Sequence, residues 1–137
     1  MQGPVDDDSH YHSDKDVVDA VVHAQHKWLK HLLVDHDIDP DAYLEEKTGQ
    51  RAIHFAAFLG DLRSVQLLID SGSDVNIRIQ KTRSMITPQE LSTVGHTPLI
   101  IAASRGFANC MKLLLSAGAS PNLLGIDTRS VFFFFFF

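Results

Sequence analysis

Apolar residues between positions 17 and 34 recur at spacings of three and four, which places their side chains on one face of a helix. The pattern predicts a helix or a tight pair of short helices, with Asp16 as the N-cap. The next segment, 35–41, is charged and contains Pro40, which predicts a loop. The apolar positions are Val17, Val18, Val21, Val22, Trp28, Leu29, Leu32 and Leu33.

The chain also contains an internal repeat. Residues 49–76 align with residues 95–122 without a gap, at an offset of 46 positions. Such self-similarity is the sequence signature of a repeat architecture, in which each unit needs a neighbour to bury its apolar face. The aligned pairs are Gly49 with Gly95, Ala56-Ala57 with Ala102-Ala103, Gly60 with Gly106, Leu67-Leu68 with Leu113-Leu114, Gly72 with Gly118, and Asn76 with Asn122.

Each copy has the capping and turn residues of a helix–turn–helix unit. The Thr97 hydroxyl can cap a helix whose first position is Pro98, where a missing N–H costs nothing. Small alanine pairs let the two helices lie close together. The glycines suit the turn between the helices and the left-handed position after them: Gly60 and Gly106 in the turn, Gly72 and Gly118 at C′.

These elements resemble the ankyrin repeat, whose Gly-x-Thr-Pro-Leu-His, Ala-Ala-x-x-Gly, Leu-Leu-x-x-Gly-Ala and Asp-Val-Asn motifs recur here. The resemblance implies an all-α fold, a short helical solenoid, and a hydrogen-bonding structural role for His54. The first copy has Arg51-Ala52-Ile53-His54 in place of Thr-Pro-Leu-His. Because the cap hydroxyl and the proline are missing, we expect its first helix to be less firmly anchored. The second copy has Ile100 where the family has histidine.

The spacing of the two copies predicts an enlarged loop. Ankyrin units recur at about 33 residues, so the offset implies that roughly 13 residues are inserted, at about 79–93. The resemblance places this insertion in the finger, the hairpin beside the concave face. A shift of about one repeat also aligns Leu32-Leu33 with Leu67-Leu68, which predicts a degenerate leading repeat or helical cap at 16–46. The expected organisation is a disordered, acidic, His-containing tail at 1–15, the cap at 16–46, repeats at 47–94 and 95–124, and an unstructured end at 125–137.

Charge is distributed unevenly along the chain. Residues 1–46 hold 12 acidic and 3 basic side chains, whereas residues 47–137 hold 5 acidic and 9 basic ones, for a net charge of -5. This balance argues against a uniformly basic nucleic-acid binder. The single cysteine, Cys110, excludes an intramolecular disulfide and a Cys-based zinc site. With no signal peptide and no apolar run long enough for a membrane helix, we expect a cytoplasmic or nuclear protein without a membrane partner.

The sequence contains no phosphate loop, dinucleotide fingerprint or nucleophile elbow, so we expect no enzyme and no cofactor. The acidic segment 35–46 imitates a calcium loop, but Pro40 stands where that loop needs glycine. A metal-binding protein rich in His and Asp is an alternative, with His23 and His26 on one helix face. The other interpretation is a solvated tail. The histidines concerned are His10, His12, His23, His26, His31 and His36.

Candidate partner-binding residues lie in two places, and the expected function is non-catalytic protein binding by an adaptor or scaffold. Phe58 and Leu59 fill the free positions of Ala-Ala-x-x-Gly, with Ser104 and Arg105 as their counterparts. The resemblance places these positions on the concave surface; the alternative is that they pack on the leading helices. The insertion adds a basic, partly apolar tip for an acidic partner segment, formed by Lys81, Arg83 and Met85, with a solvated loop as the alternative.

The C-terminal end and one asparagine complete the expectations. The poly-Phe end after Val131 predicts self-association. It also resembles translation into an intron, so the chain is either the front of a longer repeat protein or a truncated fragment without independent function.

Asn76, eight residues after Leu68, resembles the asparagine at which ankyrin repeats are hydroxylated. Asn122 follows Pro121, which removes a backbone donor, so we expect Asn76 to be the preferred site.

Overall fold

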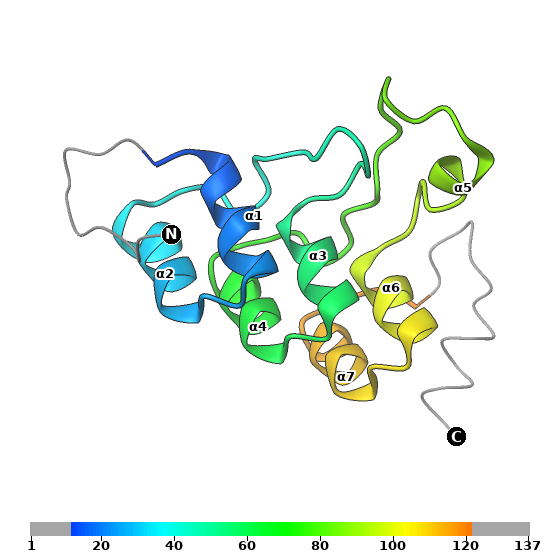
Figure 1. The fold of residues 1–137 in the computed structure, drawn as a ribbon. Helices are drawn as coiled ribbons and strands as arrows, with labels where there is room; N and C mark the ends of the chain where they lie inside the picture. Colours follow the sequence, from blue (N-terminus) through cyan, green and yellow to red (C-terminus); the bar gives the residue numbers. More distant parts are fainter. Residues whose placement is uncertain (1–11, 122–137) are drawn as a thin grey trace.

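A computed structural model describes residues 12–121, and over that range the chain is helical without strands (Figure 1). The expectations for the acidic tail and the poly-Phe end lie outside the described residues, except at positions 12–15. No helix among the described residues is both long and apolar enough to span a membrane. The elements are α1 (Asp14–Val22), α2 (His26–Lys30), the π-helical turn η1 (His31–Asp35), α3 (Ala52–Leu59), α4 (Leu62–Asp70), α5 (Pro88–Leu91), α6 (Pro98–Arg105) and α7 (Ala108–Ser116).

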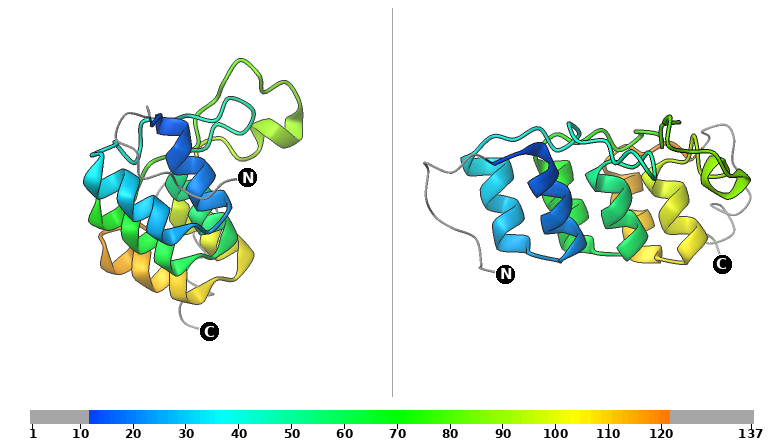
Figure 2. Two further views of the ribbon diagram at one scale, coloured as in Figure 1. Left: turned by 60° about the vertical axis from the view of Figure 1, so that its left-hand side comes forward. Right: turned by 45° about the horizontal axis from the view of Figure 1, so that its top comes forward.

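The helices stack as three pairs in two rows. One row contains α1, α3 and α6, and the other contains α2, α4 and α7, with neighbours in contact along each row. Figure 2 shows the rows side by side, with the longer connections between pairs gathered along one edge. This arrangement confirms the predicted all-α helical solenoid. The pair α1 and α2 occupies the place of a leading repeat.

A single main core runs between the two rows and through all three pairs. Leu29, Leu68 and Leu114 are fully buried, one from the outer helix of each pair. Ala56 and Ala102 are also fully buried, and their small side chains let the facing helices approach. Burying each leucine contributes about 1.5–3 kcal/mol, so the leading pair is held to the repeats by apolar contact.

Helix ends follow the residues that the repeat provides. Thr97 Oγ1 accepts a hydrogen bond from Ile100 N at 3.4 Å, and Pro98 opens α6. Gly60 and Gly106 adopt the left-handed conformation, with φ of 68° and 76°, directly after α3 and α6. A side chain would be strained at these positions, which is why glycine ends both helices.

The start of α3 lacks a hydroxyl cap but has other partners. Arg51 N donates to His54 Nδ1 at 2.9 Å, and the Arg51 guanidinium donates to Asp41 O at 2.5 Å. A second guanidinium hydrogen bond, of 3.3 Å, reaches Gln80 Oε1. The arginine that replaces threonine therefore ties the helix start to the loops on either side.

Helix α1 begins earlier than the sequence predicts. Its N-cap is Ser13 rather than Asp16, and Asp16 Oδ2 instead accepts a hydrogen bond from Ser13 N at 2.8 Å. Asp14 and Lys15 are helical, so the boundary of the disordered tail at residue 15 is wrong. The reason is local: an acidic side chain three positions into a helix satisfies the N-cap backbone, and aspartate serves there as well as at the cap itself.

The predicted insertion forms a closed finger that projects from the loop edge (Figure 1). Ile79 N donates to His96 O and Gly95 N donates to Ile79 O, both at 2.8 Å, so the base of the finger is clamped. The finger contains the short helix α5, which the sequence interpretation missed. Thr87 Oγ1 caps it by accepting from Glu90 N at 3.2 Å. The Thr-Pro signal at 87–88 is the same one that starts α6.

Candidate functional site

The free positions of both Ala-Ala-x-x-Gly motifs face solvent at the ends of α3 and α6. Phe58 is 45% and Leu59 is 47% exposed, and Ser104 and Arg105 are exposed beside them. The alanines that precede them are buried, and one further helical step turns each pair of residues outward. The arrangement places the two pairs on adjacent helices of one row, and it excludes their burial against the leading helices.

An arginine–aromatic contact joins the two pairs. The Arg105 guanidinium carbon lies 4.0 Å from the centroid of the Phe58 ring and 5.5 Å from that of Phe107. Contact over a ring face leaves the in-plane N–H groups of a guanidinium free to donate. The surface therefore presents a positioned cation next to apolar area from Leu59, and we call Phe58, Leu59, Ser104 and Arg105 the α3–α6 patch.

The three candidate residues of the finger differ in their exposure to solvent. Lys81 and Arg83 are exposed, as predicted for a basic tip. Met85 is only 5% exposed and packs in a small core with Ala57, Ile79 and Ile101, so the prediction that it contacts a partner is wrong. An apolar side chain at the root of a projecting loop gains more from covering the adjacent helices than from facing water. The exposed large apolar residues of the finger are instead Ile86, at 81%, and Leu91, at 38%.

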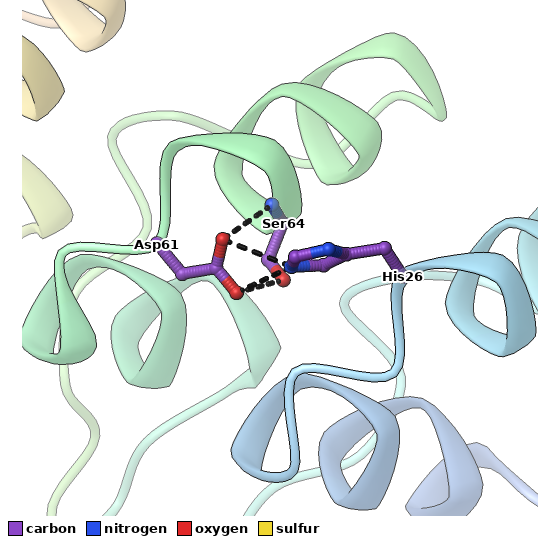
Figure 3. A network of polar contacts seen from close by, with 3 residues as sticks. All are labelled: His26, Asp61 and Ser64. Atoms are coloured by element: carbon purple, nitrogen blue, oxygen red, sulfur yellow. Dashed lines mark hydrogen bonds and ion pairs between the residues drawn. The ribbon is translucent and has the colours of Figure 1, made fainter.

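A polar network links the leading pair to the first repeat (Figure 3). His26 Nε2 lies 2.8 Å from Asp61 Oδ2, and Ser64 donates to Asp61 from its hydroxyl at 2.8 Å and from its backbone at 3.3 Å. Burial tends to raise the pKa of Asp61, but the hydrogen bonds from His26 and Ser64 outweigh it and lower that pKa.

The order of the hydrogen bonds in this network excludes Ser64 as an activated nucleophile. The carboxylate stands in the middle, and the buried Ser64 hydroxyl donates to it rather than to the imidazole of His26, so no base is positioned to activate the serine. Asp61 instead caps α4 and joins it to α2. Sequence reasoning missed the network. The Asp after Gly60 was a detectable cap, whereas nothing local indicates its histidine partner.

His54 has the structural position that the resemblance implied. It is fully buried, its Nε2 donates to Ile77 O at 2.8 Å, and its Nδ1 accepts from Arg51 N. These two bonds require the neutral tautomer with the proton on Nε2. Burial lowers the pKa of His54 to about 4, against the smaller opposing effect of the hydrogen bond to Ile77.

The structure gathers three of the histidines that suggested metal binding. The π-helical turn brings His31 beside His36, with Nε2 atoms 3.1 Å apart, and His12 contacts His36 at a ring distance of 4.5 Å. Nitrogens at that separation share a proton as donor and acceptor. Within residues 12–121, no three His, Cys, Asp or Glu side chains are placed to hold a metal ion.

Two further histidines lie apart from each other. His23 is the C-cap residue that follows α1, whereas His26 begins α2, and Ala24 between them adopts a φ of 53°. The prediction that they share one helix face is wrong, because α1 ends before His23 and the chain turns before α2 begins.

Asn76 lies between the two repeats. Its Oδ1 accepts a hydrogen bond from Ser120 N at 2.9 Å, and its backbone N donates to Asp74 Oδ1 at the same distance. The side chain is partly buried. Asn122, with which it was compared, lies outside the described residues.

Comparison with known proteins identifies the repeats. The family model described as "Ankyrin repeat" matches residues 48–80 and 94–126. The chain carries two ankyrin repeats. The residues between the two matches, 81–93, fall within the finger. Ankyrin repeats are in general a non-enzymatic fold for binding other proteins, so the chain contains a protein–protein interaction module.

The curated relatives are longer proteins, which the chain matches over part of their length. Ankyrin repeat and SOCS box protein 1 of Mus musculus is 27% identical over 78% of this chain, which covers 28% of that protein. Ankyrin repeat domain-containing protein 40 of Homo sapiens is 36% identical over 61% of this chain, which covers 20% of it. E3 ubiquitin-protein ligase KEG of Arabidopsis thaliana is 30% identical over 69% of this chain, which covers 5% of it. The chain thus spans less than a third of each of these relatives.

Proposed function

We propose that the protein is a non-catalytic adaptor or scaffold that binds an acidic, partly apolar segment of another protein through the α3–α6 patch. The observation that carries the proposal is the contact between Phe58 and Arg105, which come from the free positions of the Ala-Ala-x-x-Gly motif in adjacent repeats. An exposed aromatic ring beside a positioned guanidinium has the composition of a binding hot spot. A carboxylate on the partner can pair with the free edge of Arg105.

The charge of the repeat region supports an acidic partner. Residues 47–121 contain eight Lys or Arg side chains and four Asp or Glu side chains, and Lys81 and Arg83 extend the positive charge onto the finger. Complementary charge accelerates encounter and favours one orientation of the partner. The finger tip would therefore guide the acidic segment, and the α3–α6 patch would hold its apolar part.

The test is an affinity measurement with matched variants. A partner is first captured with the full chain and identified, and its dissociation constant is then measured by calorimetry for wild type, Phe58→Ala and Val34→Ala. Val34 is 61% exposed but lies in η1, away from the patch. Loss of a hot-spot ring is expected to cost about 2 kcal/mol, roughly a thirtyfold weaker affinity, while the control stays unchanged. An unchanged affinity together with lower stability would show that Phe58 is part of the core instead.

Several finer expectations belong to the same proposal. A cytoplasmic or nuclear location is tested by imaging a fluorescent fusion. Self-association through the end of the chain is tested by ultracentrifugation with and without residues 131–137. The proposal that the chain is the leading part of a longer repeat protein is tested by sequencing the full transcript. Hydroxylation of Asn76 by a 2-oxoglutarate-dependent dioxygenase predicts a mass gain of one oxygen there, and a gain at Asn122 alone would contradict it.

A further inference from the structure

The finger contains five hydroxyl side chains, and one of them is unengaged. Ser84 is exposed and makes no hydrogen bond among the described residues. The side-chain hydroxyls of the other four are hydrogen-bonded to backbone groups, one outside the finger and three within it: Thr82 to Glu46 O, Thr87 to Glu90 N, Ser92 to Gln89 O and Thr93 to Glu90 O. Ser84 is thus the hydroxyl of the finger that is free to react with an external enzyme.

Two basic residues precede this serine in the sequence. Lys81 stands three residues before Ser84 and Arg83 one residue before it, and both side chains are exposed. Neither makes an ion pair within the part of the chain that the structure describes. Many protein kinases select their substrates by such charge patterns, because acidic pockets on the kinase bind basic side chains ahead of the acceptor.

We propose that Ser84 is a phosphorylation site for a kinase that recognises these basic residues. In the reaction the bond between the γ-phosphorus of ATP and the oxygen that bridges it to the β-phosphate breaks, and a bond from that phosphorus to Ser84 Oγ forms. ADP leaves, and the hydroxyl proton passes to the catalytic aspartate of the kinase. The finger supplies the acceptor oxygen and the two cations, and the kinase supplies the remaining groups.

The local backbone permits the segment to open for the kinase. The turn at Ser84 is closed by one long hydrogen bond, from Met85 N to Thr82 O at 3.3 Å. The base of the finger is held separately by the two bonds of Ile79. Opening the turn therefore exposes residues 81–85 while the base of the finger stays closed. Its costs are the release of buried Met85 from Ala57 and Ile101 and the loss of the hydrogen bond from Thr82 to Glu46 O.

Phosphorylation would change the charge of the tip. A phosphoserine adds about -1.5 to -2 charges at neutral pH, which cancels the charge of Lys81 and Arg83. The consequence for binding rests on the proposed function: an acidic partner that the basic tip guides would associate more weakly with the modified protein. The modification itself does not depend on that partner.

The chain provides a matched internal control. At the repeat offset of 46, Lys81-Thr82-Arg83-Ser84 aligns with Asp127-Thr128-Arg129-Ser130. The two serines share the threonine and arginine that precede them, and they differ in the charge three residues before. The substitutions Lys81→Asp and Asp127→Lys therefore exchange the feature that the proposal depends on.

The first experiment maps phosphate on the full chain. The protein is incubated with ATP and the catalytic subunit of cyclic-AMP-dependent protein kinase, and modified residues are identified by mass spectrometry. We expect phosphate at Ser84 in the wild type, none there in Ser84→Ala, a rate about tenfold lower in Lys81→Asp, and new phosphate at Ser130 in Asp127→Lys. No phosphate at Ser84, or faster modification of Ser130 in the wild type, overturns the site.

The second experiment tests the consequence with a poly-glutamate peptide at low salt. We expect the phosphorylated protein to bind the peptide at least about fivefold more weakly than the unmodified protein does. Treatment with kinase and ATP should leave the affinity of Ser84→Ala for the peptide unchanged. Equal binding by both forms overturns the regulatory role while the mapped site stands. If the unmodified protein does not bind poly-glutamate, the acidic partner of the proposed function is wrong, and the mapping result alone decides the modification.

Discussion

Replacing Asp61 by alanine should destabilise the fold more than replacing any exposed acidic residue does. The Asp61 carboxylate makes three contacts at the junction of the leading pair and the first repeat. It caps α4 through Ser64 N, it accepts from the buried Ser64 hydroxyl, and it pairs with His26. The variant loses all three contacts and leaves the Ser64 hydroxyl without an acceptor. The loss lies in the free energy of unfolding and not in any binding reaction.

The structure sets the magnitude. Removing an N-cap costs about 1 kcal/mol, and leaving a buried hydroxyl unpaired adds about 1–2 kcal/mol. The pair with His26 is partly exposed, with side chains 31% and 16% accessible, so it adds only about 0.5 kcal/mol. We expect a total of about 2.5–3.5 kcal/mol, which lowers the Tm by roughly 10 °C in a domain of this size.

Urea and thermal unfolding followed by helix circular dichroism measure the effect. Asp70→Ala is the matched control, since Asp70 is exposed at the end of the same helix and its carboxylate accepts, among residues 12–121, a hydrogen bond only from Gln66. We expect the control to change stability by less than about 0.5 kcal/mol. The reasoning is refuted if Asp61→Ala and Asp70→Ala unfold together, or if His26→Ala alone costs as much as Asp61→Ala.

The pH dependence of this effect has a definite sign. The folded protein lowers the pKa of Asp61, so its contribution is present above the pKa of the unfolded chain, about 3.9, and is lost as pH falls through the lower folded value. The stability difference between wild type and Asp61→Ala should therefore be constant at neutral pH and narrow in strong acid.

Four other substitutions test three separate parts of the fold. Gly49→Ala should cost at least about 2 kcal/mol in urea unfolding, because φ is 67° and a Cβ would lie 1.9 Å from Gln80 O, whereas Gly95→Ala, at φ 91° with no atom within 4 Å, should cost about 1 kcal/mol. Burial lowers the pKa of His54 to about 4 from 6.5, so stability should fall by up to about 3 kcal/mol as pH drops between those values, and His54→Gln should remove that slope. Met85→Ala should lower stability by about 2 kcal/mol with no change in partner affinity, and the reverse result would restore it to the binding surface.

The repeat units were predictable because their determinants are local. Gly60, Gly106, Thr97 and Pro98 each act on a backbone conformation or hydrogen bond within a few residues, and the structure shows those conformations at those positions. The length of the finger followed from the offset alone. Whether Phe58 faces solvent or packs on the leading helices stayed open in the sequence, and the structure shows it exposed.

Other features were not predictable because they depend on contacts between distant segments. The sequence places Met85 in a largely polar loop. In the structure the finger folds back, and the Met85 side chain covers Ala57 and Ile101. The contact between Arg105 and Phe58 joins residues from two repeats, and the pairing of His26 with Asp61 crosses from α2 to α4. A sequence pattern gives each residue's own helix and face, but not the partner on the next helix.

The leading pair shows what a solenoid unit requires when its sequence motifs are absent. Asp41 Oδ2 accepts a hydrogen bond from Asp74 N at 2.8 Å, and Asn76 Oδ1 accepts one from Ser120 N at 2.9 Å. Asp74 and Ser120 are equivalent at the repeat offset, and Asp41 precedes Asn76 by the same interval that separates Leu32 from Leu67. Asp41 therefore occupies the position of the repeat asparagine, and it makes the same bond to the next unit. Since a carboxylate oxygen accepts as well as an amide oxygen does, the junction tolerates the exchange, and the unit keeps its place through this acceptor and its buried leucines.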